Sequence, residues 1–142
     1  MKPAFLDGVA IEFVRTVTFS AAHRYASPAF SPAENARVYG SLYREEGFGH
    51  NFLLEAHFAG PVDFETGMIA NLVDIDRWLK TVAGDFDHKM LNELPEFSQS
   101  APTLERISLV FFEKLRAHVS PGVRLVRLRL FEGDQTWVDY FG

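Results

Sequence analysis

Apolar residues recur at every second position in four stretches of the chain, the spacing expected when one face of a β-strand is buried. These stretches cover residues 9–19, 51–60, 123–132 and 135–141. In the third stretch, Val126, Leu128 and Leu130 fall on one face, and Arg127 and Arg129 fall on the other. Such alternation is typical of antiparallel sheets with one exposed face, so the pattern predicts four antiparallel strands.

Two further stretches have the spacing of amphipathic helices. Asn71 is placed to cap the first helix, which should end near Gly84. The second helix should begin at Pro102 and Thr103 and end before residues 120–122. The apolar positions of the first helix are Ile75, Trp78, Leu79 and Val82. The order strand, strand, helix, helix, strand, strand predicts an α+β domain, a four-stranded antiparallel sheet with both helices packed on one face.

Residues 27–33 contain breakers and polar residues and are predicted to form a long loop, a kind of segment that often carries function.

The 142 residues suit one compact domain, and no repeat or linker divides them, so 1–142 is predicted to be a single domain. Hydrophobic residues make up 47% of the chain and aromatic residues 14%, enough to form a core. This composition also favours the burial of apolar surface against other subunits.

The net charge of −5 argues against sequence-independent binding of nucleic acid and favours small-molecule or protein partners. No apolar run approaches the roughly 18 residues of a membrane span, and the first residues lack the layout of a signal peptide. We therefore expect a cytoplasmic protein with no membrane partner. Because the chain has no cysteine, disulfides, thiolate metal ligands and thiol nucleophiles are excluded.

Six segments stand out for the polar residues that they combine, in a fixed order along the chain. They are FSAAHR (19–24), GFGHNF (47–52), GMI (67–69), FDHKMLN (86–92), PTLE (102–105) and Glu132. Together they resemble the 6-pyruvoyltetrahydropterin synthase family, which includes the 6-carboxytetrahydropterin synthases. The resemblance implies a tunnelling fold, in which protomers join their sheets into a barrel, most often as a hexamer of two trimers with active sites between subunits.

The resemblance also implies a reaction class. Members of the family convert dihydroneopterin triphosphate to 6-pyruvoyltetrahydropterin, and relatives make 6-carboxytetrahydropterin on the route to queuosine. A third branch has a glutamate where the others have a cysteine, and it cleaves the side chain to give 6-hydroxymethyldihydropterin. On this basis the chain is expected to be a pterin-converting lyase.

The family pattern binds zinc through one histidine of the first segment and two histidines of a His-Gly-His segment. His23 and His50 match two of these positions, but Phe48 stands at the third and a phenyl ring cannot ligate a metal. We consider two readings: Glu46, or Glu45 as second choice, supplies a carboxylate instead, or both are ordinary solvated loop charges. Zinc is the cofactor that the resemblance implies.

The cysteine that serves the family as a proton-transfer group corresponds to Leu42 or Arg44, and neither accepts a proton at neutral pH. Glu45 or Glu46 is a candidate base, with its pKa raised by burial against Phe48. The sequence leaves open whether one of these glutamates acts as base or as metal ligand. Of the two, we take Glu46 as the catalytic candidate.

Asp87 and His88 match the family's Asp-His proton relay, in which the carboxylate orients the imidazole and supports its charged form. Glu132 matches the residue that anchors the pterin through its amino and ring nitrogens. Thr103 and Glu105 are predicted as auxiliary substrate contacts.

Three functional hypotheses follow from these residues. The first is a lyase that acts on dihydroneopterin triphosphate or a related pterin. The second is a non-catalytic pterin-binding paralogue, which explains Phe48 and the missing cysteine most simply. The third is a subunit that assembles with a fully equipped paralogue. The resemblance favours a homo-oligomer, a hexamer built as a dimer of trimers.

Overall fold

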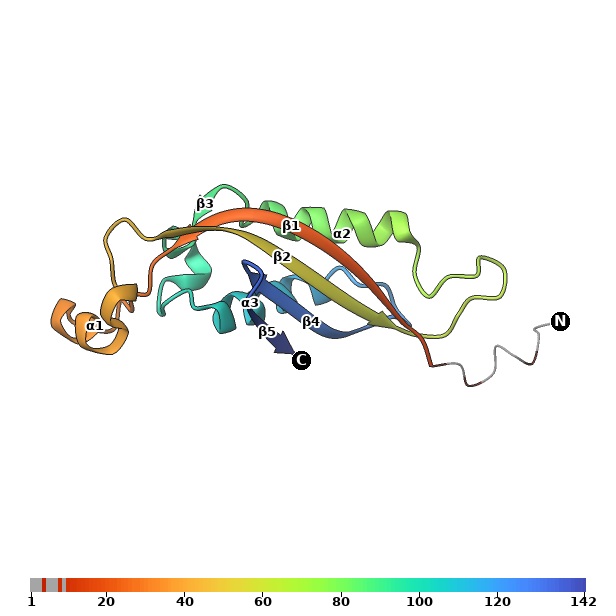
Figure 1. Cartoon of the computed structure of the whole chain (residues 1–142). Coiled ribbons are helices and arrows are strands. Elements are labelled where there is room, and N and C mark those ends of the chain that lie inside the picture. Colours follow the sequence, from red (N-terminus) through yellow and green to blue (C-terminus); the bar gives the residue numbers. More distant parts are fainter. Residues whose placement is uncertain (1–3, 5–7, 9) are drawn as a thin grey trace.

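Two twelve-residue strands, β1 (Glu12–His23) and β2 (Phe48–Ala59), form the centre of the sheet in the computed structural model (Figure 1). β4 (Arg124–Glu132) follows β2 and β5 (Thr136–Tyr140) follows β4, each antiparallel to its neighbour. A two-residue strand, β3 (Lys89–Met90), pairs with β1 in parallel. The strand order is therefore β3-β1-β2-β4-β5.

The structure describes residues 4, 8 and 10–142. Two thirteen-residue helices, α2 (Leu72–Gly84) and α3 (Leu104–Arg116), lie along the same face of the sheet (Figure 1). Asn71 caps α2 and Thr103 caps α3, as the sequence predicts. The short 3-10 helices are η2 (Gly40–Leu42), η3 (Leu91–Glu93) and η4 (Pro95–Phe97). Within the described part of the chain, no helix is long and apolar enough to cross a membrane.

The core lies between the sheet and these two helices. Phe52, Leu54 and Phe58 of β2 are fully buried there, and Glu55 and His57 between them point to the other face. On the helix side the buried residues are Ile75, Trp78, Leu79, Val82, Leu104, Ile107, Phe111, Phe112 and Leu115. The predicted α+β class, with helices on one face of the sheet, is confirmed. The sheet has five strands and not the predicted four antiparallel ones, because the two-residue β3 adds a parallel pair at the edge of β1.

Two elements differ from the sequence prediction at the N-terminal half. The first strand was expected over residues 9–19; Val9 lies outside the described residues, and β1 continues four residues further, to His23. Residues 27–31 form the expected loop, but Pro32 and Ala33 begin a helix that the sequence did not predict, α1 (Pro32–Tyr39). Ser31 caps this helix and Pro32 occupies its first position, where a missing N–H is harmless, so the proline starts a helix instead of breaking one.

A β-bulge alters the alternation in β4. The register between β2 and β4 shifts between His57 and Phe58, so that Arg127 pairs with His57 and Leu125 pairs with Phe58. Leu125 is therefore buried, whereas Val126, expected on the core face, is half-exposed. A bulge inserts one residue into the period of two, which the sequence pattern did not reveal. Beyond it, Leu128 and Leu130 occupy the core face as predicted.

Candidate metal and proton-transfer site

Three polar side chains meet where β1, β2 and β4 leave the core. His23 ends β1, His50 lies near the start of β2 and Glu132 ends β4. The register places Ala21 opposite His50 and Phe52 opposite Glu132, so all three side chains continue the buried face of the sheet. One ligand atom from each of the three lies within 4.8 Å of the other two.

His23 is held in one orientation. Its side chain is only 1% exposed, and Nδ1 lies 2.7 Å from the Pro102 carbonyl oxygen. Nδ1–H donates to that oxygen, which leaves the lone pair of Nε2 free. Burial lowers the pKa of His23 and opposes protonation. A neutral imidazole with a fixed tautomer is the form that binds a metal.

The Nε2 atoms of His23 and His50 are both buried, and neither makes a hydrogen bond of acceptable geometry within the described residues. Glu132 Oε1 is only 2.8 Å from Nε2 of His50, and Oε2 is 3.9 Å from Nε2 of His23. Buried polar atoms normally have partners, so atoms this close but poorly aligned suggest a shared partner. These residues therefore fit a metal ion, and the imidazole and carboxylate donors suit zinc.

Phe48 takes the place where the family pattern has a histidine. Its ring stacks beside the imidazole of His50, with centroids 6.4 Å apart and planes 14° from parallel. The Arg44 guanidinium lies 5.0 Å from the Phe48 ring centroid, on the ring face. Phe48 therefore shields His50 from one side and offers no donor atom.

Glu46 lies away from the three clustered side chains. Its side chain is 75% exposed, and Oε2 lies 3.5 Å from Nε of Arg44. Its own backbone N–H and then Arg44 lower the pKa of Glu46, in contrast to the increase that we expected from burial against Phe48. Glu45 is exposed as well. The proposed role of Glu46 as a catalytic base remains a prediction.

Asp87 and His88 lie on the loop between α2 and β3. Nε2 of His88 is 3.5 Å from Oδ2 of Asp87, and the His88 side chain is 82% exposed. His88 is the one non-glycine residue with positive φ, 58°, in the described part of the chain. His88 and His50 are both among the residues that line a cavity of about 520 Å³, whereas His23, Asp87 and Glu132 do not line it.

The sequence reasoning missed Tyr25. Its ring lies 5.5 Å from that of His23, and burial, followed by the carboxylate of Glu132, raises the pKa of Tyr25. The phenol is therefore protonated at neutral pH and can donate a hydrogen bond. Its position directly after the segment FSAAHR is the only sequence signal that pointed to it.

Thr103 and Glu105 stand at the start of α3, on the Pro102 side of the site. The Thr103 hydroxyl accepts the backbone N–H of Arg106 at 3.2 Å, which is the geometry of a helix cap. Glu105 is exposed in the first turn of the helix, near enough to affect the pKa of Tyr25. Their predicted contacts with substrate remain predictions.

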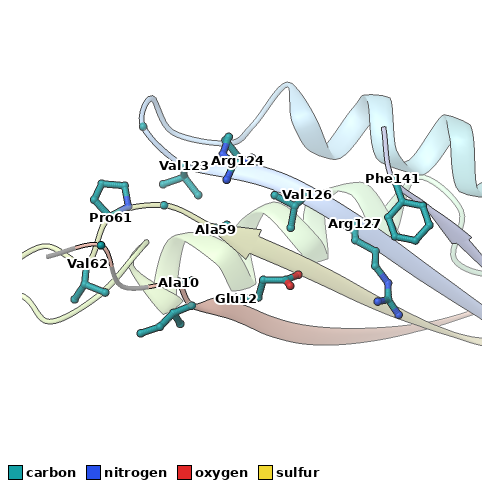
Figure 2. Close-up of a pocket in the computed structure, with 14 residues that line it drawn as sticks. Ala10, Glu12, Ala59, Pro61, Val62, Val123, Arg124, Val126, Arg127 and Phe141 are labelled. Atoms are coloured by element: carbon teal, nitrogen blue, oxygen red, sulfur yellow. The ribbon is translucent and has the colours of Figure 1, made fainter. Parts of the chain in front are cut away.

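A larger cavity, of about 1020 Å³, lies at the opposite end of the sheet, where β1 begins and β2 ends. Figure 2 shows that Val62, Val123, Val126 and Phe141 contribute apolar walls to it, with Glu12, Arg124 and Arg127 as its charged groups. Ala59 lies nine positions after His50 on β2, a distance of about 30 Å. This groove is therefore remote from His23 and His50.

Comparisons with known proteins place this geometry in context. The family model of 6-pyruvoyl tetrahydropterin synthase matches residues 12–142. The 6-pyruvoyl tetrahydrobiopterin synthase of Drosophila melanogaster is 32% identical over 130 residues, which is 90% of this chain and 77% of the fly protein. The dihydroneopterin monophosphate aldolase of Pyrococcus furiosus is 30% identical over 95 residues, 67% of this chain and 78% of that protein.

A solved structure agrees with the sequence matches. The Caenorhabditis elegans 6-pyruvoyl tetrahydropterin synthase superposes with a TM-score of 0.88 at 28% identity, covering 94% of this chain and 96% of that one. The similarity extends over nearly the whole chain and includes both the sheet and the helices that cover it.

Proposed function

Because this chain belongs to the 6-pyruvoyl tetrahydropterin synthase family, we propose that it is a lyase acting on 7,8-dihydroneopterin triphosphate or a closely related pterin. One observation carries the proposal: His50 and His88 line the same cavity. A group that orients a substrate oxygen and a group that moves a proton must act on neighbouring atoms of one substrate, and a shared cavity allows that.

Each residue then has a proposed role. His23 and His50 hold a zinc ion, which when bound supplies Lewis acidity that polarises the oxygens of the pterin side chain. Asp87, whose Oδ2 lies 3.5 Å from Nε2 of His88, orients the imidazole, and His88 accepts and returns a proton at the other ring nitrogen, Nδ1. Glu46 is a candidate second base, in the loop where relatives carry a cysteine or a glutamate.

The pterin ring needs hydrogen-bonding partners next to these groups. Thr103 and Glu105, on the first turn of α3, and Tyr25, whose phenol is protonated, are proposed to contact it. Glu132 is a further partner by family resemblance, although its carboxylate also lies against both imidazoles. A carboxylate can hold the planar donor edge of a pterin through two hydrogen bonds.

We propose that the active form is a homo-oligomer, with a hexamer as the expected size. The imidazole of His88 is 82% exposed in the single chain, which is unusual for a proton relay and supports a site completed by a second copy. The same exposure fits a hetero-oligomer in which this chain contributes His88 to an active site at its interface with a paralogue.

A non-catalytic pterin-binding protein is the second candidate. Phe48 in place of a metal-ligating histidine, together with the absence of cysteine, favours it. Such a protein would keep the pocket and lose the chemistry.

Incubating the purified protein with dihydroneopterin triphosphate, with and without added zinc, and following the products by mass spectrometry separates these candidates. Zinc-dependent formation of 6-pyruvoyltetrahydropterin, 6-carboxytetrahydropterin or 6-hydroxymethyldihydropterin supports the enzyme and identifies its branch. Micromolar pterin binding without any product contradicts the enzyme and supports the binding protein.

A further inference from the structure

We infer that Glu132 is the third metal ligand of this protein and replaces the imidazole that is missing at Phe48. The inference rests on the proposed function in taking zinc as the metal, and it assigns Glu132 to the metal in preference to the pterin ring. Two histidines and one glutamate form a known donor set of catalytic zinc sites.

The first support is the way in which Glu132 spans the two imidazoles. Oε1 lies 2.8 Å from Nε2 of His50 and Oε2 lies 3.9 Å from Nε2 of His23, so each carboxylate oxygen approaches one imidazole nitrogen. The side chain is 21% exposed, whereas an unpaired carboxylate prefers full exposure to water. A cation between the three groups compensates this burial.

The second support is the direction of the donor atoms. Neither Nε2 atom makes an acceptable hydrogen bond, although Oε1 of Glu132 is close enough to His50 for one. Donors that converge on one central ion point their lone pairs at the ion and are poorly aligned with each other. The hydrogen bond from Nδ1 of His23 to the Pro102 carbonyl oxygen keeps the Nε2 lone pair on the side of Glu132.

The third support is that the rival carboxylates are badly placed. Glu46 is 75% exposed and lies beside Arg44, and Glu45 is exposed too. Within residues 10–142, His23, His50 and Glu132 are the one set of three potential ligands that lie this close together. The replacement for the missing histidine therefore comes from a different strand, β4, and not from the neighbouring loop.

A carboxylate in place of the third imidazole changes the chemistry of the site. A carboxylate ligand neutralises part of the charge of a bound dication, which three neutral imidazoles do not. An oxygen donor also suits harder cations better than an imidazole does. We therefore expect this site to accept manganese or cobalt beside zinc more readily than a three-histidine site would.

The inference is tested by metal binding in the absence of any pterin. The wild-type chain and the variants Glu132→Gln and Glu46→Gln are stripped of metal, titrated with zinc against a competing chelator, and analysed for bound metal after dialysis. Glu132→Gln should weaken zinc binding more than about 100-fold, beyond the loss typical of residues that only orient a ligand. Glu46→Gln, which removes the rival carboxylate, should stay within about twofold of wild type.

A rescue variant makes the test sharper. Position 48 lies on the same face of β2 as His50, so Phe48→His in the Glu132→Gln background restores the family's third imidazole. Zinc affinity should recover to within about tenfold of wild type. The visible absorption of bound cobalt should differ between wild type and the rescued variant, because the third donor changes from oxygen to nitrogen.

Several results would overturn the inference. One is that the wild-type protein binds no metal. Another is that Glu132→Gln keeps the zinc affinity and the cobalt spectrum of wild type. A third is that Glu46→Gln loses its metal. Circular dichroism and thermal unfolding of the metal-free proteins identify a variant that fails to fold. If Glu132→Gln fails to fold, the cobalt spectrum of the wild-type protein decides, because it differs between an oxygen and a nitrogen as the third donor. Metal bound through Glu132 without pterin turnover contradicts the proposed function alone.

Discussion

Asp87 accepts a hydrogen bond from the backbone N–H of Ser20, with 2.9 Å between Oδ1 and the nitrogen. The next residue, His88, donates its own backbone N–H to the Ser20 carbonyl oxygen. The Asp-His pair is thereby fixed to β1 three residues before His23. His88 adopts φ 58°, which costs a non-glycine residue on the order of 1 kcal/mol, and these hydrogen bonds hold it there.

Replacing His88 by asparagine should abolish most turnover without unfolding the protein. Asparagine tolerates positive φ and removes the imidazole, so the backbone is kept and the proton relay is lost. The initial rate of pterin conversion should fall about 10²- to 10⁴-fold, the usual contribution of a general acid or base. The measurement is the initial rate at saturating substrate, followed by chromatography.

His118→Asn is the matched control, because this histidine follows α3 and is not among the residues that line the cavity of His50 and His88. Its rate and thermal unfolding midpoint should equal those of wild type. A His88→Asn rate within about threefold of wild type would exclude His88 from the chemistry, since a general acid or base contributes far more.

The helices on the sheet were predictable because their signals are local. Asn71 and Thr103 lie beside the N–H groups that they cap, and the apolar stripe of each helix is readable within four turns. The pairing of Asp87 with His88 is also a matter of adjacent residues. The segment from Ser31 to Pro32 carries a local signal too, but the proline was read as a breaker when it is the first residue of α1.

The residues of the candidate metal site were not predictable in the same way. Glu132 is separated from His50 by 82 positions, and they meet only because Phe52 pairs with Glu132 across β2 and β4. That register depends on side-chain packing along the whole strand pair and on the bulge near Arg127. Sequence reasoning searched instead in the loop beside Phe48, where Glu46 is close in sequence but exposed.

Thr103 should prove to be a structural cap whatever else it contacts. Thr103→Ala removes the acceptor of the Arg106 N–H and should lower the free energy of unfolding by about 1 kcal/mol. Thr103→Ser keeps the hydroxyl and should stay within about 0.5 kcal/mol of wild type. Urea denaturation at one fixed protein concentration measures both, since oligomer stability depends on concentration.

The effect of Thr103 on pterin affinity separates its two roles. If the hydroxyl also contacts the ring, Thr103→Ala weakens pterin binding more than loss of the cap alone explains, and Thr103→Ser restores the affinity. An alanine variant as stable as wild type would contradict the assignment of Thr103 as a cap.

Phe86 links the core to the Asp-His pair, and truncating it should be costly. The side chain is fully buried, with ring centroids 5.7 Å from Phe19 and 5.4 Å from Phe111. Phe86→Ala leaves a cavity and should lower the free energy of unfolding by about 3 to 5 kcal/mol.

Phe64→Ala is the control, because this side chain is 50% exposed, and it should change the free energy of unfolding by less than about 0.5 kcal/mol. Chemical denaturation of both variants checks this, and a loss below about 1 kcal/mol for Phe86→Ala would show that the core there collapses onto the gap.

The contact between Glu96 and Lys114 should make a small, pH-dependent contribution to stability. Nζ of Lys114 lies 2.6 Å from Oε1 of Glu96 and 3.1 Å from Oδ2 of Asp85, so it ties α3 to η4 and to the end of α2. The hydrogen bond from Lys114 lowers the pKa of Glu96, and the same bond raises the pKa of Lys114.

The direction of the pH effect follows from these shifts. Because the pKa of Glu96 is lower in the folded state, its contribution is fully present above the unfolded pKa of about 4.3 and disappears as the pH falls through the folded pKa. The contribution of Lys114 is present below its unfolded pKa of about 10.4 and disappears as the pH rises through the higher folded pKa. The contact is therefore effective across the neutral range.

Glu96→Gln should lower the free energy of unfolding by about 0.5 kcal/mol near neutral pH, the size expected for a partly exposed ion pair. The difference from wild type should shrink toward zero as the pH falls through the folded pKa, where wild-type Glu96 is itself uncharged. Glu93→Gln removes an exposed carboxylate with no ion pair in the described part of the chain, and it should show no such pH-dependent difference. Urea denaturation of the three proteins at a series of pH values tests this, and a Glu96→Gln deficit that persists undiminished in acid would mean that the lost interaction is not an ion pair.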